Sequence, residues 1–235
     1  MTRSLEALVD EQARRWALAR KEGVQEARRP VITVARQHGA LGTELAHRLA
    51  EELKLDLFDR EIIQRIAESS HLSERVVSSL DEKSRELLTD WLAAVASRDY
   101  LSPAEYRYHL TRVIGAIAHQ GGAVIIGRGS NLILGPGQAL RVLVVGPLEV
   151  RVRRLMERES LSDREARRRI QEVEADRRAF LIKYFHSDFP APESFDVMVN
   201  PIVLGLEGCV RVVTSALDAL PARRSSDALH EHQPA

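Results

Sequence analysis

The chain has 235 residues, 44% of them hydrophobic, which is enough for one α/β domain with a sizeable core and short appendages. Lysine plus arginine and aspartate plus glutamate both number 34, so a formal net charge of zero gives no general attraction to nucleic acid or anionic membranes. The single cysteine, Cys209, excludes an internal disulfide and fits a reducing compartment. No apolar run approaches the roughly 20 residues of a membrane span, so we expect a cytoplasmic protein without membrane partners.

The first predicted helix covers residues 3–22, because its apolar residues fall roughly on one face. A charged stretch that ends at Pro30 separates this helix from the first strand. We therefore expect residues 1–29 to form a helical appendage. It would pack on the domain or on a second copy of the chain, forming a homodimer.

A strand, a glycine loop and a helix are predicted in succession between Val31 and Leu53. An apolar β-branched run breaks into a loop that contains Gly39 and Gly42, and an amphipathic helix pattern follows directly. This order is typical of α/β proteins that bind phosphate. Glycines let the backbone approach the anion, and the helix N-terminus offers N–H groups and partial positive charge. The loop has no lysine, because Gly42 is followed by Thr43.

The middle of the chain alternates helices with short apolar strands. A short extended piece is predicted at residues 57–59, with helices over 61–69, 72–97 and 103–119. Buried strands are predicted at residues 123–126 and 140–145, each followed by a loop that contains glycine.

The last part of the chain continues this alternation. Helices are predicted over residues 148–159, 163–184 and 206–220, with a strand at 195–199 and a disordered polar tail at 221–235. Ser162 and Glu165 match a capping box at the start of the second of these helices. Residues 30–220 therefore predict one α/β domain with a mainly parallel sheet covered by helices on both faces.

Ligands of such sheets bind outside the carboxyl ends of the strands, where the loops at residues 36–43, 59, 127–130 and 146 should converge. In the first loop, Arg36 or His38 could supply the charge that neutralises a phosphate. Thr43 could cap the helix or approach a magnesium ion. The alternative is a plain connection whose glycines serve only the turn.

Two further candidate binding residues follow strands. Arg128 lies between two glycines and could grip a phosphate with paired donors, or be an ordinary turn arginine at the surface. Asp59 could accept hydrogen bonds from a sugar hydroxyl or a base amino group, or cap the helix that follows it.

Ten arginines fall between Arg151 and Arg178, with acidic residues interleaved. Most are expected to be exposed partners at i,i+4 spacing, and a minority to point at phosphates from two helices joined near residues 160–162. Such helices could form a mobile cover that supplies cations and excludes water during phosphoryl transfer. Nucleic-acid binding is the competing interpretation, but no aromatic residue is interleaved before Phe180.

These segments together resemble the cytidylate kinase-like family, a branch of the nucleoside monophosphate kinases within the P-loop fold. The resemblance covers residues 30–217 and rests on the order of VITVARQHGALGTELAHRLAEEL, LFDREII, AVIIGRGSNLIL, LRVLVVGPLEVRVRRLMERE, VEADRRAFLIKYF and FDVMVNPIVLGLEGCV. It implies a three-layer α/β/α fold with helical acceptor-binding and lid insertions. It also implies transfer of a phosphoryl group from ATP, with Mg²⁺, to a pyrimidine nucleoside monophosphate such as CMP.

The resemblance implies roles for particular residues. Donor phosphates would lie against Gly39, Ala40, Gly42 and Thr43, with Arg36 beside them and Thr43 near the metal. Acceptor binding would involve Asp59, Arg128, Asp176 and Lys183. The catalytic cations would be Arg151, Arg154 and Arg177.

The sequence departs from the family pattern at the loop. Gly39-Ala40-Leu41-Gly42 stands where many members have Gly-Ser-Gly followed by lysine or glycine, and a leucine tolerates positive φ poorly. Arg128 is followed by Gly129, so the aspartate that often follows this arginine is absent. A catalytically impaired nucleotide- or phosphometabolite-binding regulatory protein is therefore the second functional hypothesis.

Overall fold

The sheet has five strands, and every neighbouring pair is parallel. The computed structural model describes residues 10, 13–16, 18, 29–68, 73, 74, 76, 77, 80, 104–188 and 191–220. The strands are β1 (Val31–Arg36), β2 (Asp56–Phe58), β3 (Ala123–Ile126), β4 (Leu140–Val144) and β5 (Val197–Val199), in the spatial order β2-β3-β1-β4-β5. The central strand β1 therefore lies between β3 and β4, and its carboxyl end is at the middle of the sheet edge.

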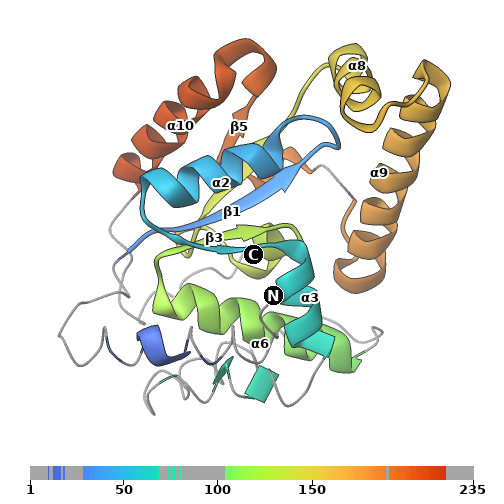
Figure 1. Cartoon of the computed structure of the whole chain (residues 1–235). Coiled ribbons are helices and arrows are strands. Elements are labelled where there is room, and N and C mark those ends of the chain that lie inside the picture. Colours follow the sequence, from blue (N-terminus) through green and yellow to red (C-terminus); the bar gives the residue numbers. More distant parts are fainter. Residues whose placement is uncertain are drawn as a thin grey trace.

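Helices cover both faces of the sheet (Figure 1). On one side lie α2 (Gly42–Glu52) and α10 (Pro201–Ala219), and on the other α3 (Arg60–Glu68) and α6 (Ala104–Gln120). The remaining elements are α7 (Ser130–Ile133), α8 (Leu148–Glu159), α9 (Asp163–Phe185) and the 3₁₀ turn η2 (Pro192–Ser194). The architecture is a three-layer α/β/α fold of the P-loop kinase type, which confirms the predicted fold class.

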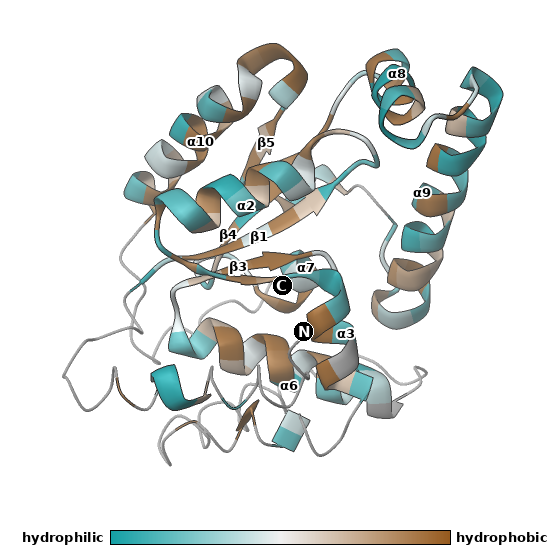
Figure 2. Ribbon diagram, viewed as in Figure 1, coloured by the Kyte–Doolittle hydropathy of each residue, from teal (hydrophilic) through white to brown (hydrophobic). Residues whose placement is uncertain are grey.

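Two hydrophobic cores lie on opposite faces of the sheet. Val31 and Ile125 pack into the core with α3 and α6, whereas Ile32 and Val124 pack into the core with α2 and α10. Successive residues of a strand point to opposite faces, so the central strands are apolar along most of their length. Burial on both faces explains the continuous apolar runs of the sequence, which Figure 2 shows as brown strands between the helical layers.

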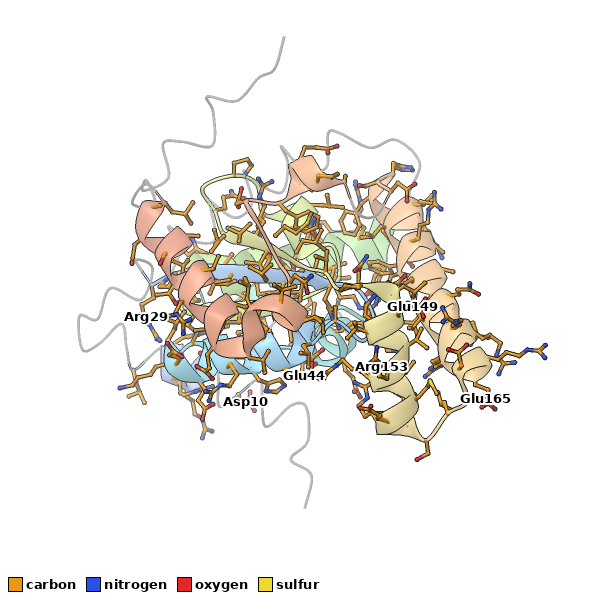
Figure 3. The ribbon with its side chains drawn as sticks, turned by 90° about the horizontal axis from the view of Figure 1, so that it is seen from above. Asp10, Arg29, Glu44, Glu149, Arg153 and Glu165 are labelled. Carbon is orange, nitrogen blue, oxygen red and sulfur yellow. The ribbon has the colours of Figure 1, made fainter. Side chains whose placement is uncertain are left out.

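The α8–α9 hairpin stands beside this body rather than on the sheet (Figures 1 and 3). It has a small core of its own, formed by Val152, Leu155, Ala166 and Ile170. The Ser162–Glu165 capping box is present as predicted, with both reciprocal hydrogen bonds at the start of α9. Figure 2 shows α9 as largely hydrophilic apart from its C-terminal part, which approaches the body. This hairpin is the predicted lid insertion.

A missed turn and an early helix start are two of the differences from the sequence prediction. The turn α7 is missed because one turn after Gly129 is too short to show a helical period. The last helix begins at Pro201 instead of Leu206, because Asn200 caps it by accepting a hydrogen bond from the Ile202 N–H at 3.1 Å. Gly205 then breaks the helical conformation with φ 69° and ψ 165°. The regular helical spacing of apolar residues therefore begins only after Gly205, where the sequence prediction placed the start of the helix.

Part of the N-terminal appendage is described. Trp16 is buried, with its ring centroid 6.5 Å from that of Phe58, and Arg15 pairs with Asp56 at 3.0 Å. This segment therefore packs on the domain at β2. The rest of residues 1–29, most of the 72–97 helix prediction and the predicted tail at 221–235 lie outside the described residues. Within those that are described, no helix is long and apolar enough to cross a membrane.

Candidate active site

The loops that follow β1, β3 and β4 start at the same edge of the sheet. Arg36 is in register with Val144, and Val34 with Ile126. The Gln37 N–H donates to the Val144 carbonyl at 2.9 Å, and the Gly146 N–H donates to Gln37 Oε1 at 3.0 Å. The predicted convergence of strand ends is therefore confirmed, and these bonds fix the first loop against the third.

A cavity of about 630 Å³ opens at this edge. Its lining comes from the first loop, the start of α2, the hairpin and α10: Arg36, Gln37, His38, Gly39, Ala40, Leu41, Gly42, Thr43, Glu44, His47, Arg48, Arg158, Arg177 and Leu206. All residues predicted to hold the donor phosphates are among them. Of the other predicted site residues, only Arg177 lines this cavity.

The turn into α2 uses two residues in the left-handed region. Gly39 has φ 81°, and an added Cβ would lie 3.2 Å from the Arg151 carbonyl oxygen. Leu41 has φ 67° and precedes α2 without a side-chain cap. A non-glycine residue there costs roughly 1–2 kcal/mol. The loop therefore keeps the left-handed turn that the sequence made doubtful, with strained backbone next to the cavity.

Arginines gather between the loops. The guanidinium of Arg36 has Arg60, Arg128 and Arg177 near enough to lower its pKa, and Asp59 is the acid that opposes them. The Arg177 Nη1–H donates to the Arg36 carbonyl oxygen at 2.7 Å, which ties the hairpin to the end of β1. Arg36, Arg60, Arg128 and Arg177 are called the arginine cluster below.

The arginine cluster has unused donors. Among the described residues, the Nε groups of Arg36, Arg128 and Arg177 are shut off from solvent and have no hydrogen-bond partner. Burial, reinforced by neighbouring arginines, lowers the pKa of Arg36 from its ordinary value to about 9 and also lowers that of Arg177. Burial likewise lowers the pKa of Arg128. Buried charges are normally paired, so this excess of positive charge fits a bound anion.

Arg128 is held in a position that an unconstrained turn arginine would not adopt. Its backbone has φ 54°, its Nη2–H donates to Gln64 Oε1, and its guanidinium carbon lies 4.8 Å from the centre of the Phe180 ring. Gly129 contacts the same aromatic group, since an added Cβ would be 2.5 Å from a Phe185 ring carbon. Residues of α3 and α9 therefore fix the Arg128 side chain within the arginine cluster.

Arg151, predicted to be catalytic, lies behind the loop. It is buried, with its Nε–H donating to the Gly146 carbonyl at 2.9 Å and its Nη1–H donating to the His38 carbonyl at 3.1 Å and to Glu174 Oε1 at 2.7 Å. Glu174 also accepts the His38 N–H at 3.1 Å. These bonds join the first loop to both helices of the hairpin.

The other hairpin predictions also lie outside the cavity lining. Arg154 is half-buried on α8, Asp176 is exposed on α9, and Lys183 is exposed with its Nζ 5.1 Å from the Tyr184 ring centre. Arg158 lines the cavity instead. A helix presents one residue in three or four to a given neighbour, so a sequence rich in arginine does not reveal which one faces the ligand.

Like Arg36, His38 has a buried side-chain nitrogen without a hydrogen-bond partner among the described residues. Its Nε2 is buried without a hydrogen bond in the described part of the chain. Burial, with Arg177 and other arginines nearby, lowers its pKa from 6.5 to about 4. His38 is therefore neutral at physiological pH in the ligand-free protein.

Asp59 and its neighbours illustrate what the sequence analysis missed. Asp59 Oδ1 accepts the Ile62 N–H at 2.8 Å, which is the helix-capping alternative. Arg60, the next residue, and Gln64, one turn later, contribute to the arginine cluster and its support. Both residues follow β2 closely in the sequence, and this position could have marked them as candidate site residues.

The donor set for a metal is small. In the described ranges, no group of three histidine, cysteine, aspartate or glutamate side chains could hold a metal ion. Thr43 is exposed in the first turn of α2 and lines the cavity. This fits Mg²⁺, which is usually bound through substrate phosphates, water and few protein ligands.

A glycine loop between a buried parallel strand and a helix, facing arginines whose buried Nε groups have no partner among the described residues, is the arrangement expected of a P-loop kinase fold. The family comparison is consistent with this class. The model of the cytidylate kinase-like family matches residues 31–201, so the chain belongs to that family.

Solved structures give a similar picture of the fold. An uncharacterized protein from Eubacterium ventriosum has 17% identity and a TM-score of 0.60, with 81% of this chain and 99% of that one covered. The shikimate kinase from Acinetobacter baumannii, solved with shikimate, has 12% identity and a TM-score of 0.44, with 82% and 95% covered. The shikimate kinase from Bacteroides thetaiotaomicron has 18% identity and a TM-score of 0.42, with 80% and 98% covered. The comparison with curated proteins gave no match.

Proposed function

We propose that the protein transfers a phosphoryl group from ATP to a nucleoside monophosphate, with CMP as the first acceptor to test. The observation that carries this proposal is the arginine cluster, whose buried unpartnered Nε–H groups lie beside the glycine loop. Two phosphorylated substrates meeting there would supply the missing negative charge. The family match is in line with this reaction.

In this proposal the chain acts by positioning and electrostatics. The donor phosphates lie against the loop from Gly39 to Thr43, and the acceptor phosphate lies against Arg128. The bond between the γ-phosphorus and the ADP oxygen breaks as an acceptor phosphate oxygen bonds to that phosphorus. Arg177 and Arg158, supplied by the hairpin, offset the charge spread over the transferred group. Mg²⁺, held by the phosphates and Thr43, would neutralise the donor.

The remaining predicted residues have supporting roles in the same proposal. Asp59 holds the start of α3 and keeps one carboxylate near the arginine cluster. Arg151 positions the loop and hairpin. Arg154, Asp176 and Lys183 would reach substrate only if the hairpin closes further over the site.

The test is a coupled assay with ATP, Mg²⁺ and a panel of nucleoside monophosphates, with ADP formation measured for each acceptor. Turnover that depends on a pyrimidine monophosphate supports the proposal. Matched variants are Arg128→Ala, expected to raise the acceptor KM, and the exposed Arg153→Ala as a control outside the cavity (Figure 3). An absence of both nucleotide binding and turnover refutes it.

The second candidate function is nucleotide binding without turnover. Leu41 in a strained left-handed conformation and the missing loop lysine favour this alternative. ATP binding by calorimetry with no product from any acceptor would select it.

A further inference from the structure

Compared with the phosphate-loop pattern G-x-x-x-x-G-K-[ST], this chain has a cation, Arg36, at the position of the first glycine and a glycine, Gly42, at the position of the lysine. Counted along this chain, the pattern would place its first glycine at position 36, its lysine at 42 and its hydroxyl residue at 43. The chain instead has Arg36, Gly42 and Thr43. A cation is therefore present, but it belongs to the last residue of β1 instead of the first residue of α2.

The structure shows that these two residues share one space. A Cβ added at Gly42 would lie 2.3 Å from Arg36 Cβ and 2.8 Å from Arg36 Cγ. Both atoms are at the base of the arginine side chain, so they cannot swing away as the end of a flexible chain would. A side chain at position 42 and the present conformation of Arg36 therefore exclude each other.

From Gly42 the Arg36 side chain extends across the site to the loop after β3. Its Nη1 would be 2.7 Å from a Cβ added at Gly127, whose φ of 72° already favours glycine. Two glycines thus leave a path for the side chain, one near its base and one at its guanidinium. The Nε group lies between them, shut off from solvent and without a partner within the described chain.

The rest of the first loop offers no competing cation. His38 is neutral at physiological pH because burial lowers its pKa to about 4. Arg177 and Arg158 line the cavity from the hairpin, so their position depends on how that hairpin is placed. Arg36 is instead the last residue of the central strand, so its backbone position is set by β1 and its pairing with β4.

We propose that Arg36, lying in the space left open by Gly42, neutralises the donor phosphates in place of a lysine on the loop. The inference rests on the proposed kinase function, because it requires a polyphosphate ligand at this loop. It predicts that Arg36 contributes more to the binding of ATP than of ADP, and nothing to the binding of adenosine. A residue that only shaped the loop would not show this dependence on phosphate number.

The experiment measures the dissociation constants of ATP, ADP, adenosine and inorganic tripolyphosphate by calorimetry, without any turnover. Arg36→Ala is expected to weaken ATP and tripolyphosphate binding by about 10- to 100-fold and to leave adenosine unchanged. Gly42→Ala is expected to act in the same direction, because its Cβ displaces Arg36. Arg153→Ala, an exposed arginine outside the cavity, is expected to stay within about twofold of the wild type.

A double variant tests the exchange itself. Gly42→Lys alone places a side chain against Arg36 and should bind ATP weakly, whereas Arg36→Gly with Gly42→Lys removes the clash and should bind more tightly than Gly42→Lys. Circular dichroism checks that each variant is folded, and Arg36→Met replaces Arg36→Ala if the alanine variant is not.

The outcomes separate the two proposals. Wild-type ATP binding that Arg36→Ala and Arg36→Met leave within twofold overturns the role of Arg36 and leaves the proposed function standing. An equal loss for ATP and adenosine overturns it too, because that pattern reflects loop shape. A wild-type protein that binds neither ATP nor tripolyphosphate refutes both proposals.

Discussion

Replacing Arg36 by methionine should make the ligand-free protein more stable. The arginine is charged at neutral pH although burial and its arginine neighbours disfavour that charge. Methionine keeps the length of the side chain and removes the charge. The substitution would thus remove a charge that lowers the free energy of unfolding when no anion is bound. Binding sites often keep such groups because ligand binding requires them although they lower stability.

The magnitude follows from the pKa of Arg36. The fall from the ordinary arginine pKa to about 9 corresponds to ~5 kcal/mol of disfavoured charge. The folded-state pKa is lower than the unfolded one, so stability from this group is present above the ordinary arginine pKa and is lost as the pH falls to about 9. The whole penalty therefore applies at pH 7. Because the side chain is only partly buried, we expect Arg36→Met to recover ~1–3 kcal/mol.

Urea unfolding followed by circular dichroism at pH 7.5, without nucleotide or phosphate buffer, measures this difference. The exposed Arg153→Met is the control and should lie within about 0.5 kcal/mol of the wild type. Added tripolyphosphate should stabilise the wild type more than Arg36→Met. A ligand-free Arg36→Met variant less stable than the wild type would refute the reasoning that unpaired charge accumulates at this site.

Three further predictions concern the loop and its support. At Leu41, thermal unfolding should show Leu41→Val to be ~1–2 kcal/mol less stable than Leu41→Gly, because a β-branched residue tolerates a φ of 67° worst. Equal melting temperatures for the two variants would contradict backbone strain at this position. Arg151→Met should cost ~3 kcal/mol in urea unfolding, because it removes the ion pair to Glu174 and the bonds to the Gly146 and His38 carbonyls, whereas Arg167→Met, at an exposed ion pair, should change stability much less. Wild-type stability combined with lost turnover in Arg151→Met would support the predicted catalytic role. His38 has a pKa of about 4 when folded and 6.5 ordinarily, so stability is full above pH 6.5 and declines as the pH falls towards 4. His38→Gln should remove ~1 kcal/mol of the wild-type loss between pH 7 and 5, and identical losses in variant and wild type would show that folding does not lower the pKa of His38.

The elements of the domain were predictable because their signals are local. Apolar runs at Val31–Val34 and Ala123–Ile126 must be strands of a two-faced sheet, and the start of α9 follows from its capping box. Where the signal was interrupted, prediction failed. Gly205 hid the first turn of α10 because it breaks the helical period.

The site was predictable in position and only partly in its members. Loops after parallel strands meet at one edge, which placed Arg36, Gly39 and Thr43 in the cavity. The roles of Arg151 and Arg158 did not follow from the sequence. Both lie on α8, and only the packing of the hairpin turns Arg151 under the loop and Arg158 towards the cavity.

By itself, the sequence determined the layered fold, the converging loops and the absence of a loop lysine, because all three follow from residue type and spacing. Only the tertiary structure decided where the positive charge lies. Arg36 and Gly42 are six positions apart on different elements, and their shared space appears only when β1 runs into α2. Likewise, Arg128 joins the arginine cluster because the sheet places β3 beside β1, bringing together charges that lie far apart along the chain.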